Sequence, residues 1–181
     1  MKLLKSFAMF LVLVMVFTGT PLGAVQEIKE VNLINRILKE TNDDCKKVLR
    51  AAYHMREQAL PFSSPKYQEK FRFQPNDGCP RDILSISRTM RSRIRMLSGI
   101  LYHVPISNRN EVFTGVYTSL TSLDVSAKRA LRAIRDGNFA LYMISSQTSD
   151  KEARNIHKLV GDFEDMINQS IERSDATHEN L

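Results

Sequence analysis

Residues 26–60, QEIKEVNLINRILKETNDDCKKVLRAAYHMREQAL, carry the pattern on which the predicted fold rests. Apolar or small residues recur there at alternating spacings of three and four, which places them on one stripe of an α-helix. The stripe comprises Val31, Ile34, Leu38, Thr41, Cys45, Val48, Ala52, Met55 and Ala59. Its phase continues through residues 41–44, although Thr or Asp could cap a second helix there. We therefore expect one long helix that ends at Pro61.

Three further segments show the same periodicity. The second predicted helix opens at Cys79-Pro80, because proline suits a first helical turn, and it ends at residues 103–105. The third begins after Asn108 or Asn110 and stops at Gly137, which can take the left-handed conformation that ends helices. The fourth begins at the capping box Ser-Asp-Lys-Glu of residues 149–152. Residues 139–144 (FALYMI) stay open between a helical extension and a buried crossover.

Two long connections set the predicted order of the helices. Residues 61–78 contain three prolines and end in the turn signal Asn-Asp-Gly, and about a dozen residues separate the third helix from the fourth. Tyr67, Phe71 and Phe73 suggest that the first connection packs on the helices. Helices with one apolar stripe each must bury those stripes against one another. We therefore predict an all-α, four-helix bundle over residues 25–173, ordered up-up-down-down, with a polar tail over 174–181.

The first 24 residues form a predicted secretory signal peptide. Lys2 and Lys5 precede an apolar run from Phe7 to Phe17, and small residues then lead to a cleavage site after Ala24. The apolar run is too short to cross about 30 Å of hydrocarbon, and no later segment approaches the ~18 apolar residues that a span needs. We expect a secreted, extracellular protein with no membrane span. A retained N-terminal anchor is the alternative.

The charge of the chain narrows the class of partner. The net charge is +6, but Lys2 and Lys5 would leave with the signal peptide, so that 24 basic and 20 acidic residues remain. This mild excess does not argue for nucleic acid and is compatible with an acidic receptor surface, glycosaminoglycan or ordinary solubilising charge. Two basic clusters could form a partner surface, or they could be solvated faces with cations near a helix C-terminus. They comprise Arg88, Arg91 and Arg95 of the second helix and Lys128, Arg129 and Arg132 of the third.

The two cysteines, Cys45 and Cys79, are expected to pair. An oxidising compartment favours one intramolecular disulfide when a secreted chain contains only two thiols. Closing this loop would stabilise the fold by roughly 3–4 kcal/mol by restricting the unfolded chain.

No sequence motif points to catalysis. The chain contains no nucleophile elbow, phosphate-binding loop or HExxH motif, so we expect neither an enzyme nor a cofactor. Two cysteines and four scattered histidines give no metal-ligand spacing, so no metal site is predicted. Asn168-Gln169-Ser170 is a sequon, which makes Asn168 a candidate for glycosylation.

The second predicted helix resembles helix B of the long-chain helical cytokines. Cys79-Pro80 opens it, and Ser98-Gly99-Ile100-Leu101-Tyr102 stands near its end. In the group of granulocyte colony-stimulating factor, interleukin-6 and the interleukin-23 alpha-subunit, a cysteine ends the first crossover loop and a Gly-aliphatic-aromatic patch lies late in the helix. The direct match covers residues 79–102. The signal peptide, the four-helix order and the long first loop are also similar to this family.

This resemblance implies a secreted ligand of a cell-surface receptor, without enzymatic activity. It also implies that receptors contact the solvent-facing sides of the helices. On the fourth helix the implied receptor-binding residues are Arg154, Lys158, Asp162 and Asp165. The competing hypothesis is a secreted helical carrier that holds a lipid or another apolar ligand between its helices.

Overall fold

The computed structural model describes residues 22–103 and 108–178, and these ranges contain helices and connections but no strand. The all-α class predicted from the sequence is therefore confirmed. The α-helices are α2 (Leu22–Ala59), α3 (Pro65–Lys70), α4 (Gly78–Ile100), α5 (Arg109–Asp136) and α6 (Phe139–His178). Two short 3-10 segments, η1 (Leu60–Ser63) and η2 (Leu101–His103), follow α2 and α4. The single long helix expected through residues 41–44 is also confirmed, since α2 is continuous there.

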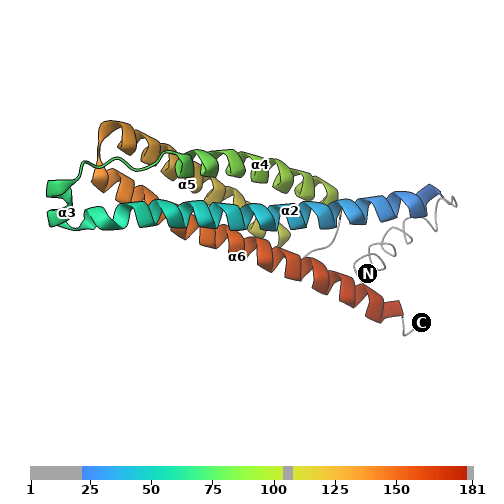
Figure 1. Ribbon diagram of the computed structural model, residues 1–181. Coiled ribbons are helices and arrows are strands. Elements are labelled where there is room, and N and C mark those ends of the chain that lie inside the picture. The colour runs from blue at the N-terminus through green and yellow to red at the C-terminus, as the bar shows by residue number, and fades with distance from the viewer. Residues whose placement is uncertain (1–21, 104–107, 179–181) are drawn as a thin grey trace.

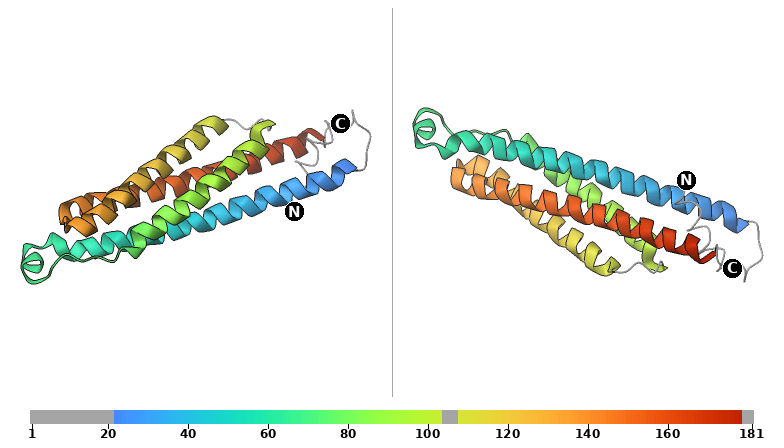
Figure 2. Two further views of the ribbon diagram at one scale, coloured as in Figure 1. Left: turned by 90° about the horizontal axis from the view of Figure 1, so that it is seen from above. Right: turned by 90° about the horizontal axis from the view of Figure 1, so that it is seen from below.

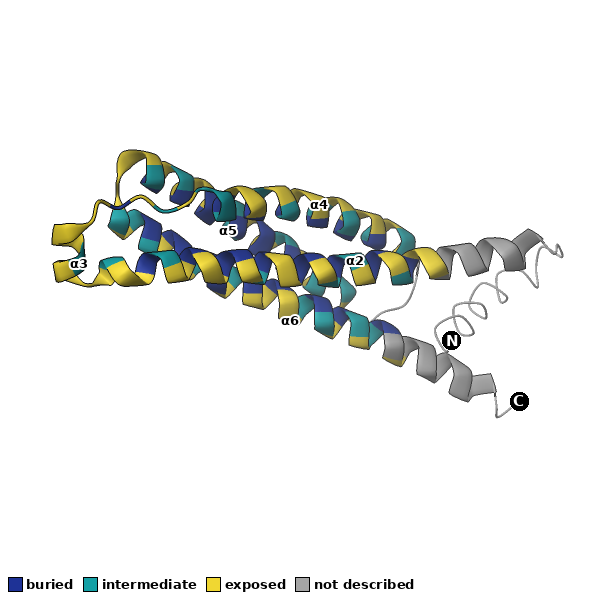
Figure 3. Cartoon of the chain, viewed as in Figure 1, coloured by how far each residue is buried: buried dark blue, intermediate teal, exposed yellow. Residues whose placement is uncertain are grey.

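The predicted apolar stripes face the interior. Helices α2, α4, α5 and α6 lie side by side, with α2 and α5 each packed against both α4 and α6 (Figure 1). The stripe residues of the first predicted helix, from Ile34 to Ala59, are all buried. Figure 3 shows the buried residues on the sides of the helices that face one another. The largest fully buried side chains are Tyr142, Phe163, Met55, Ile83, Met90, Ile94, Leu97, Leu101, Leu120, Leu123 and Ile156.

Helices adjacent in sequence run antiparallel, which makes the predicted up-up-down-down order wrong. Gln58, near the end of α2, lies 3.8 Å from the Cys79 sulfur at the start of α4. Arg93, late in α4, pairs with Glu40, near the middle of α2, at 3.0 Å. Helices α4 and α5 are also antiparallel to each other, and so are helices α5 and α6. As a result, the described ends at Leu22 and His178 lie at the same end of the molecule (Figure 2).

A tight turn between α5 and α6 explains the difference in order. Gly137 has φ of +64°, and the Asn138 backbone N–H donates to Ala133 O at 2.8 Å, as in a Schellman helix end. The Asn138 side chain then accepts the Leu141 N–H at 2.9 Å and begins α6. Residues 139–144 are thus the first turns of α6. The predicted capping box at 149–152 is wrong, because Ser149 lies inside α6 and shares a hydrogen bond with Ser126 at 2.8 Å.

The connection between α2 and α4 packs on the end of the helices, as its aromatic residues predicted. Phe73 is buried, and its ring centroid lies 5.0 Å from Phe62, 5.5 Å from Phe139 and 5.2 Å from Tyr142. Phe71 remains exposed. The connection therefore turns back over one end of the molecule and delivers the chain into α4 beside the end of α2. Its length is used for this cap and not for a crossover.

The predicted disulfide between Cys45 and Cys79 is wrong. Both thiols are free, and Cys79 contacts Gln58, which follows Cys45 by 13 residues along the continuous helix α2. At 1.5 Å per residue these two positions of α2 are about 20 Å apart, whereas a disulfide needs Cα atoms within about 7 Å. Burial, with the nearby Asp44 charge, raises the pKa of Cys45 to about 12. Burial also raises the pKa of Cys79.

The predictions for the chain ends fall mostly outside the described residues. Of the expected signal peptide, only residues 22–24 are described, as the first residues of α2. Helix α6 continues to His178, so residues 174–178 of the expected polar tail are helical. None of the described helices combines the length and the apolar composition that a membrane span needs.

Candidate functional site

Acidic and basic side chains of the described residues pair mostly along the same helix, but four ion pairs cross the interfaces between neighbouring helices. At the interface of α2 with α4, Arg93 binds Asp44 and lies 3.0 Å from Glu40. Lys47 also contacts Asp44, at 3.2 Å, and the Asp44 side chain is 7% exposed. The carboxylates at this interface are paired with cations of their own helix and with Arg93, which indicates a structural role.

A second charged pair joins α4 to α5 and divides one of the predicted basic clusters. Arg91 Nη2 lies 3.0 Å from Asp124 Oδ2, and Asp124 also accepts the Ser87 hydroxyl. Arg91 is thereby half-buried, while Arg88 and Arg95 stay exposed on α4. Because of this pairing, Arg91 is less exposed to solvent than Arg88 and Arg95, the other two arginines of that cluster.

The second predicted basic cluster lies on α5. On α5, Lys128, Arg129 and Arg132 are exposed, but Arg129 lines a hollow beside α6 together with Thr148. Arg132 lies 3.6 Å from Asp136 of its own helix. Arg91 and Arg132 are thus each paired with a carboxylate of this chain.

The four residues implied for receptor binding do share the outer side of α6. Arg154, Lys158, Asp162 and Asp165 are all exposed. Arg154 is not a free surface charge, however, because it contacts Asp150 at two points. Asn168 also lies in α6, but its side chain is outside the described residues.

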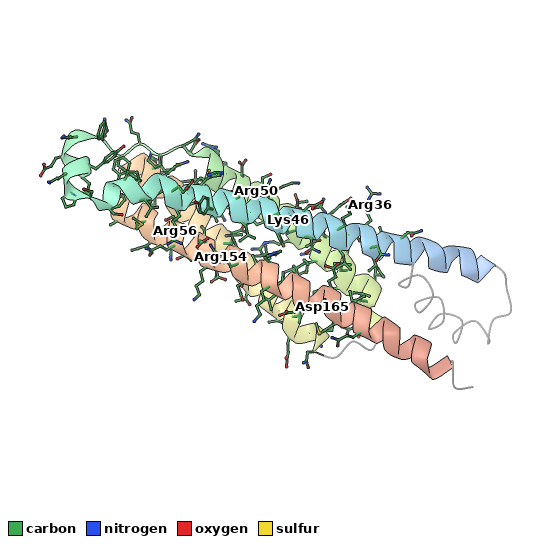
Figure 4. The ribbon with its side chains drawn as sticks, turned by 60° about the horizontal axis from the view of Figure 1, so that its bottom comes forward. Arg36, Lys46, Arg50, Arg56, Arg154 and Asp165 are labelled. Carbon is green, nitrogen blue, oxygen red and sulfur yellow. The ribbon has the colours of Figure 1, made fainter. Side chains whose placement is uncertain are left out.

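A surface with several exposed cations joins α2 to α6, and we call it the α2–α6 face. Figure 4 shows Lys46, Arg50, Arg56 and Arg154 on the same side of the molecule, over these two helices. All four side chains are exposed. The α2–α6 face is defined by Lys46, Arg50, Tyr53 and Arg56 of α2 and by Arg154 and Lys158 of α6.

Asp150 lies beneath this face and connects its two helices. It is 8% exposed, and its Oδ2 atom accepts hydrogen bonds from Arg56 Nη1 and Arg154 Nε, each at 3.3 Å. Arg154 Nη2 lies 3.2 Å from the other oxygen, Oδ1, which accepts no hydrogen bond of good geometry within the described structure. One buried carboxylate thus holds two guanidinium groups from different helices close together.

Tyr53 gives the α2–α6 face an aromatic component. Its side chain is half exposed, and its ring lies edge-on to His54 with centroids 5.9 Å apart. A hydrogen bond to the Glu57 carboxylate, with the charge of that group, raises the pKa of Tyr53. The tyrosine therefore remains a neutral, amphipathic contact beside the arginines.

A hollow of about 420 Å³ lies further along the same two helices. Two of its lining residues are hydrogen-bonded to each other, since Asn42 Nδ2 donates to Glu164 Oε2 at 2.7 Å. Its walls are mostly charged or amide side chains, with Leu38 as the apolar exception. The lining residues are Asn35, Leu38, Lys39, Asn42, Asp43, Lys46 and Glu164.

Two residues of the α2–α6 arrangement were missed by sequence reasoning. Asp150 was assigned to a helix cap, and Arg56 lies off the apolar stripe among other charged residues. The available signal was that an uninterrupted α6 would place Asp150 one turn before Arg154 on the same side. Nothing in the sequence marked Arg56 as their partner from α2.

No metal cluster supplements these surfaces, since no three His, Cys, Asp or Glu residues of the described ranges gather into a metal-binding arrangement. Comparison with known proteins adds no relative: no family model, no curated protein and no solved structure matches the chain. The α2–α6 face, with its buried carboxylate and paired arginines, is therefore the candidate functional site.

Proposed function

We propose that this chain is a secreted, noncatalytic ligand that binds a cell-surface receptor through the α2–α6 face. In this proposal the four long helices act as a four-helix bundle, which presents the face on a rigid support. The observation that carries the proposal is the row of exposed cations on α2 and α6, with Arg56 and Arg154 arranged around one buried carboxylate. Such a surface suits a complementary acidic surface on a partner, because charge complementarity accelerates association and excludes wrong partners.

The proposal rests on this surface and not on helix order. Growth hormones and cytokines have two long crossover connections, whereas α5 and α6 are joined by a tight turn. Membership of the cytokine family is therefore no part of the proposal.

The carrier alternative lacks a comparable observation. Apart from Leu38, the hollow between α2 and α6 is lined by lysine, asparagine, aspartate and glutamate side chains, which suit an apolar ligand poorly.

Charge reversal at two sites tests the proposal. Arg50 and Lys158 are exposed and have no ion-pair partner among the described residues. The double variant Arg50→Glu/Lys158→Glu should keep its free energy of unfolding within about 0.5 kcal/mol of the parent. Its binding to receptor-bearing cells, measured by flow cytometry, should weaken at least about tenfold.

The matched control reverses two charges on another helix. Arg88→Glu/Arg95→Glu on α4 changes the net charge equally and should leave cell binding nearly intact. Equal losses in both variants would show that net charge alone matters and would refute the assignment to α2 and α6. Failure of the parent to bind any cell-surface protein over a broad panel of cells would refute the receptor function itself.

A further inference from the structure

The Arg56–Asp150–Arg154 cluster has more donors than its own acceptor can use. Asp150 Oδ2 receives one hydrogen bond from each arginine. Each guanidinium group carries five N–H donors, so most of them remain available. The side chains of Arg56 and Arg154 are 51% and 64% exposed, which leaves those donors accessible from solvent.

The charges in this cluster are also unbalanced. Two guanidinium groups surround one carboxylate, so the cluster keeps one net positive charge at neutral pH. Burying a carboxylate costs free energy that an apolar residue would avoid, and a buried ion pair is weak evidence for stability. Asp150 instead has a positioning role, because it holds two flexible arginine side chains beside each other before any partner binds.

From this geometry we infer that the Arg56–Arg154 pair is a binding site for a side-chain carboxylate of an acidic segment in the partner protein. This inference rests on the proposed function and names the chemistry of the same face. The planar guanidinium groups can bind a carboxylate through two parallel hydrogen bonds. Asp150 is the positioning residue of the site.

The surroundings favour a protein segment over a sulfated polysaccharide. Asp43 lies 3.6 Å from Lys46, and Glu57 lies 3.4 Å from His54, so acidic groups alternate with the cations of α2. A continuous polyanion would bring its sulfates against these carboxylates, whereas an acidic protein segment can place single carboxylates between them. The half-exposed Tyr53 adds an aromatic contact of the kind that is enriched in protein interfaces.

Fluorescence anisotropy with two probes tests the inference. The probes are a labelled, end-blocked peptide of alternating Glu and Gly and a labelled heparin oligosaccharide of similar charge, each measured over a series of salt concentrations. We expect the parent to bind the peptide, and Arg56→Gln/Arg154→Gln to weaken this binding at least about tenfold. Arg88→Gln/Arg95→Gln removes the same charge from α4 and should change the affinity less than about twofold.

Two further variants separate positioning from charge. Asp150→Asn makes the face more positive by one charge, so general attraction would strengthen peptide binding, whereas loss of positioning weakens it. Arg56→Lys/Arg154→Lys keeps both charges without the planar donors, and it should bind the peptide several-fold more weakly than the parent. Circular dichroism measures whether each variant is folded. If the glutamine variant does not fold, the lysine variant tests the site in its place.

The outcomes separate this inference from the proposed function. Unchanged peptide affinity in the glutamine and lysine variants would overturn the carboxylate site while cell binding by the parent still supported a receptor. Stronger peptide binding by Asp150→Asn would overturn the positioning role. Tighter binding of heparin than of the peptide, lost in Arg56→Gln/Arg154→Gln, would replace the acidic segment with a sulfated polysaccharide. Peptide binding without any cell-surface protein partner would refute the receptor proposal and leave the carboxylate site standing.

Discussion

Single residues decide where the helices of this protein end. Gly137 adopts a left-handed conformation, and the hydrogen bonds of residues 137 and 138 close the end of α5. Asn138 then caps α6 with its side chain. Thr41, which could have begun a new helix, donates instead to Ile37 O at 2.7 Å from inside α2. The same residue types therefore act as stop, cap or helix interior according to the backbone around them.

Gly137→Ala should destabilise the fold. A Cβ at this position would meet no atom within 4 Å, so the cost comes from the left-handed backbone, about 1–2 kcal/mol. Gly161→Ala is the control: it also has open space, but it lies inside α6 and should stabilise by up to about 1 kcal/mol. Urea unfolding followed by circular dichroism measures both. Equal effects of the two substitutions would contradict the turn conformation.

Glu40 should contribute to stability in a pH-dependent way. The hydrogen bond from Arg36, together with the charge of Arg93, holds the pKa of Glu40 below its ordinary 4.5, against the opposing effect of desolvation. Because its folded-state pKa is depressed, the stabilisation is complete above the unfolded value and is lost as pH falls through the folded value.

Unfolding measured from about pH 5 to about pH 3 should therefore show a smaller loss of stability in Glu40→Gln than in the parent. Glu69→Gln on α3 is the control, since Glu69 is exposed. A parent-like pH dependence in Glu40→Gln would mean that other carboxylates account for the acid sensitivity.

At the scale of helices, the interface of α5 with α6 includes several small buried residues. Ser119, Ser126 and Ser149 are buried there, and a Cβ on Gly115 would lie only 3.1 Å from Leu159. Small side chains allow two helices to approach closely, and the serine hydroxyls bond to the backbone or to each other across the interface. These three serines are thus part of the core.

Ser149→Leu should therefore cost about 1–3 kcal/mol of unfolding free energy, because the packed interface has no room for a larger side chain. Ser92→Leu on the exposed side of α4 should change it by no more than about 0.5 kcal/mol. Chemical denaturation gives both values. A mild effect at Ser149 would indicate that α5 and α6 are less closely packed than the structure has them.

At the scale of the whole molecule, the antiparallel order of α2 and α4 can be measured directly. Spin labels at Arg36 and Arg95, in a variant with both native cysteines replaced, should lie close together because Glu40 pairs with Arg93. Labels at Arg36 and Arg81 should be clearly farther apart, because Arg81 lies 14 positions before Arg95, which is about 20 Å along α4. Electron–electron double resonance reports both distances. The reverse ranking would mean that the two helices run parallel.

The apolar periodicity by itself predicted the all-helical class and the presence of four long helices. It also predicted which residues of those helices are buried in nearly every case. It did so because the spacing of apolar residues along an amphipathic helix identifies the side that is buried. It also located the outer face of α6, with Arg154, Lys158, Asp162 and Asp165 in solvent.

The tertiary structure alone decided the order of the helices, the separation of Cys45 from Cys79 and the meeting of Arg56 with Asp150. The meeting of Arg56 with Asp150 and the place of Cys79 beside Gln58 depend on contacts between segments far apart in the chain, which local spacing does not encode. The two-residue turn at Gly137 left no length for a crossover, and a continuous α2 kept Cys45 about 20 Å from the level of Cys79. Asp150 is buried only because α2 passes beside α6 there and supplies Arg56 as its second cation.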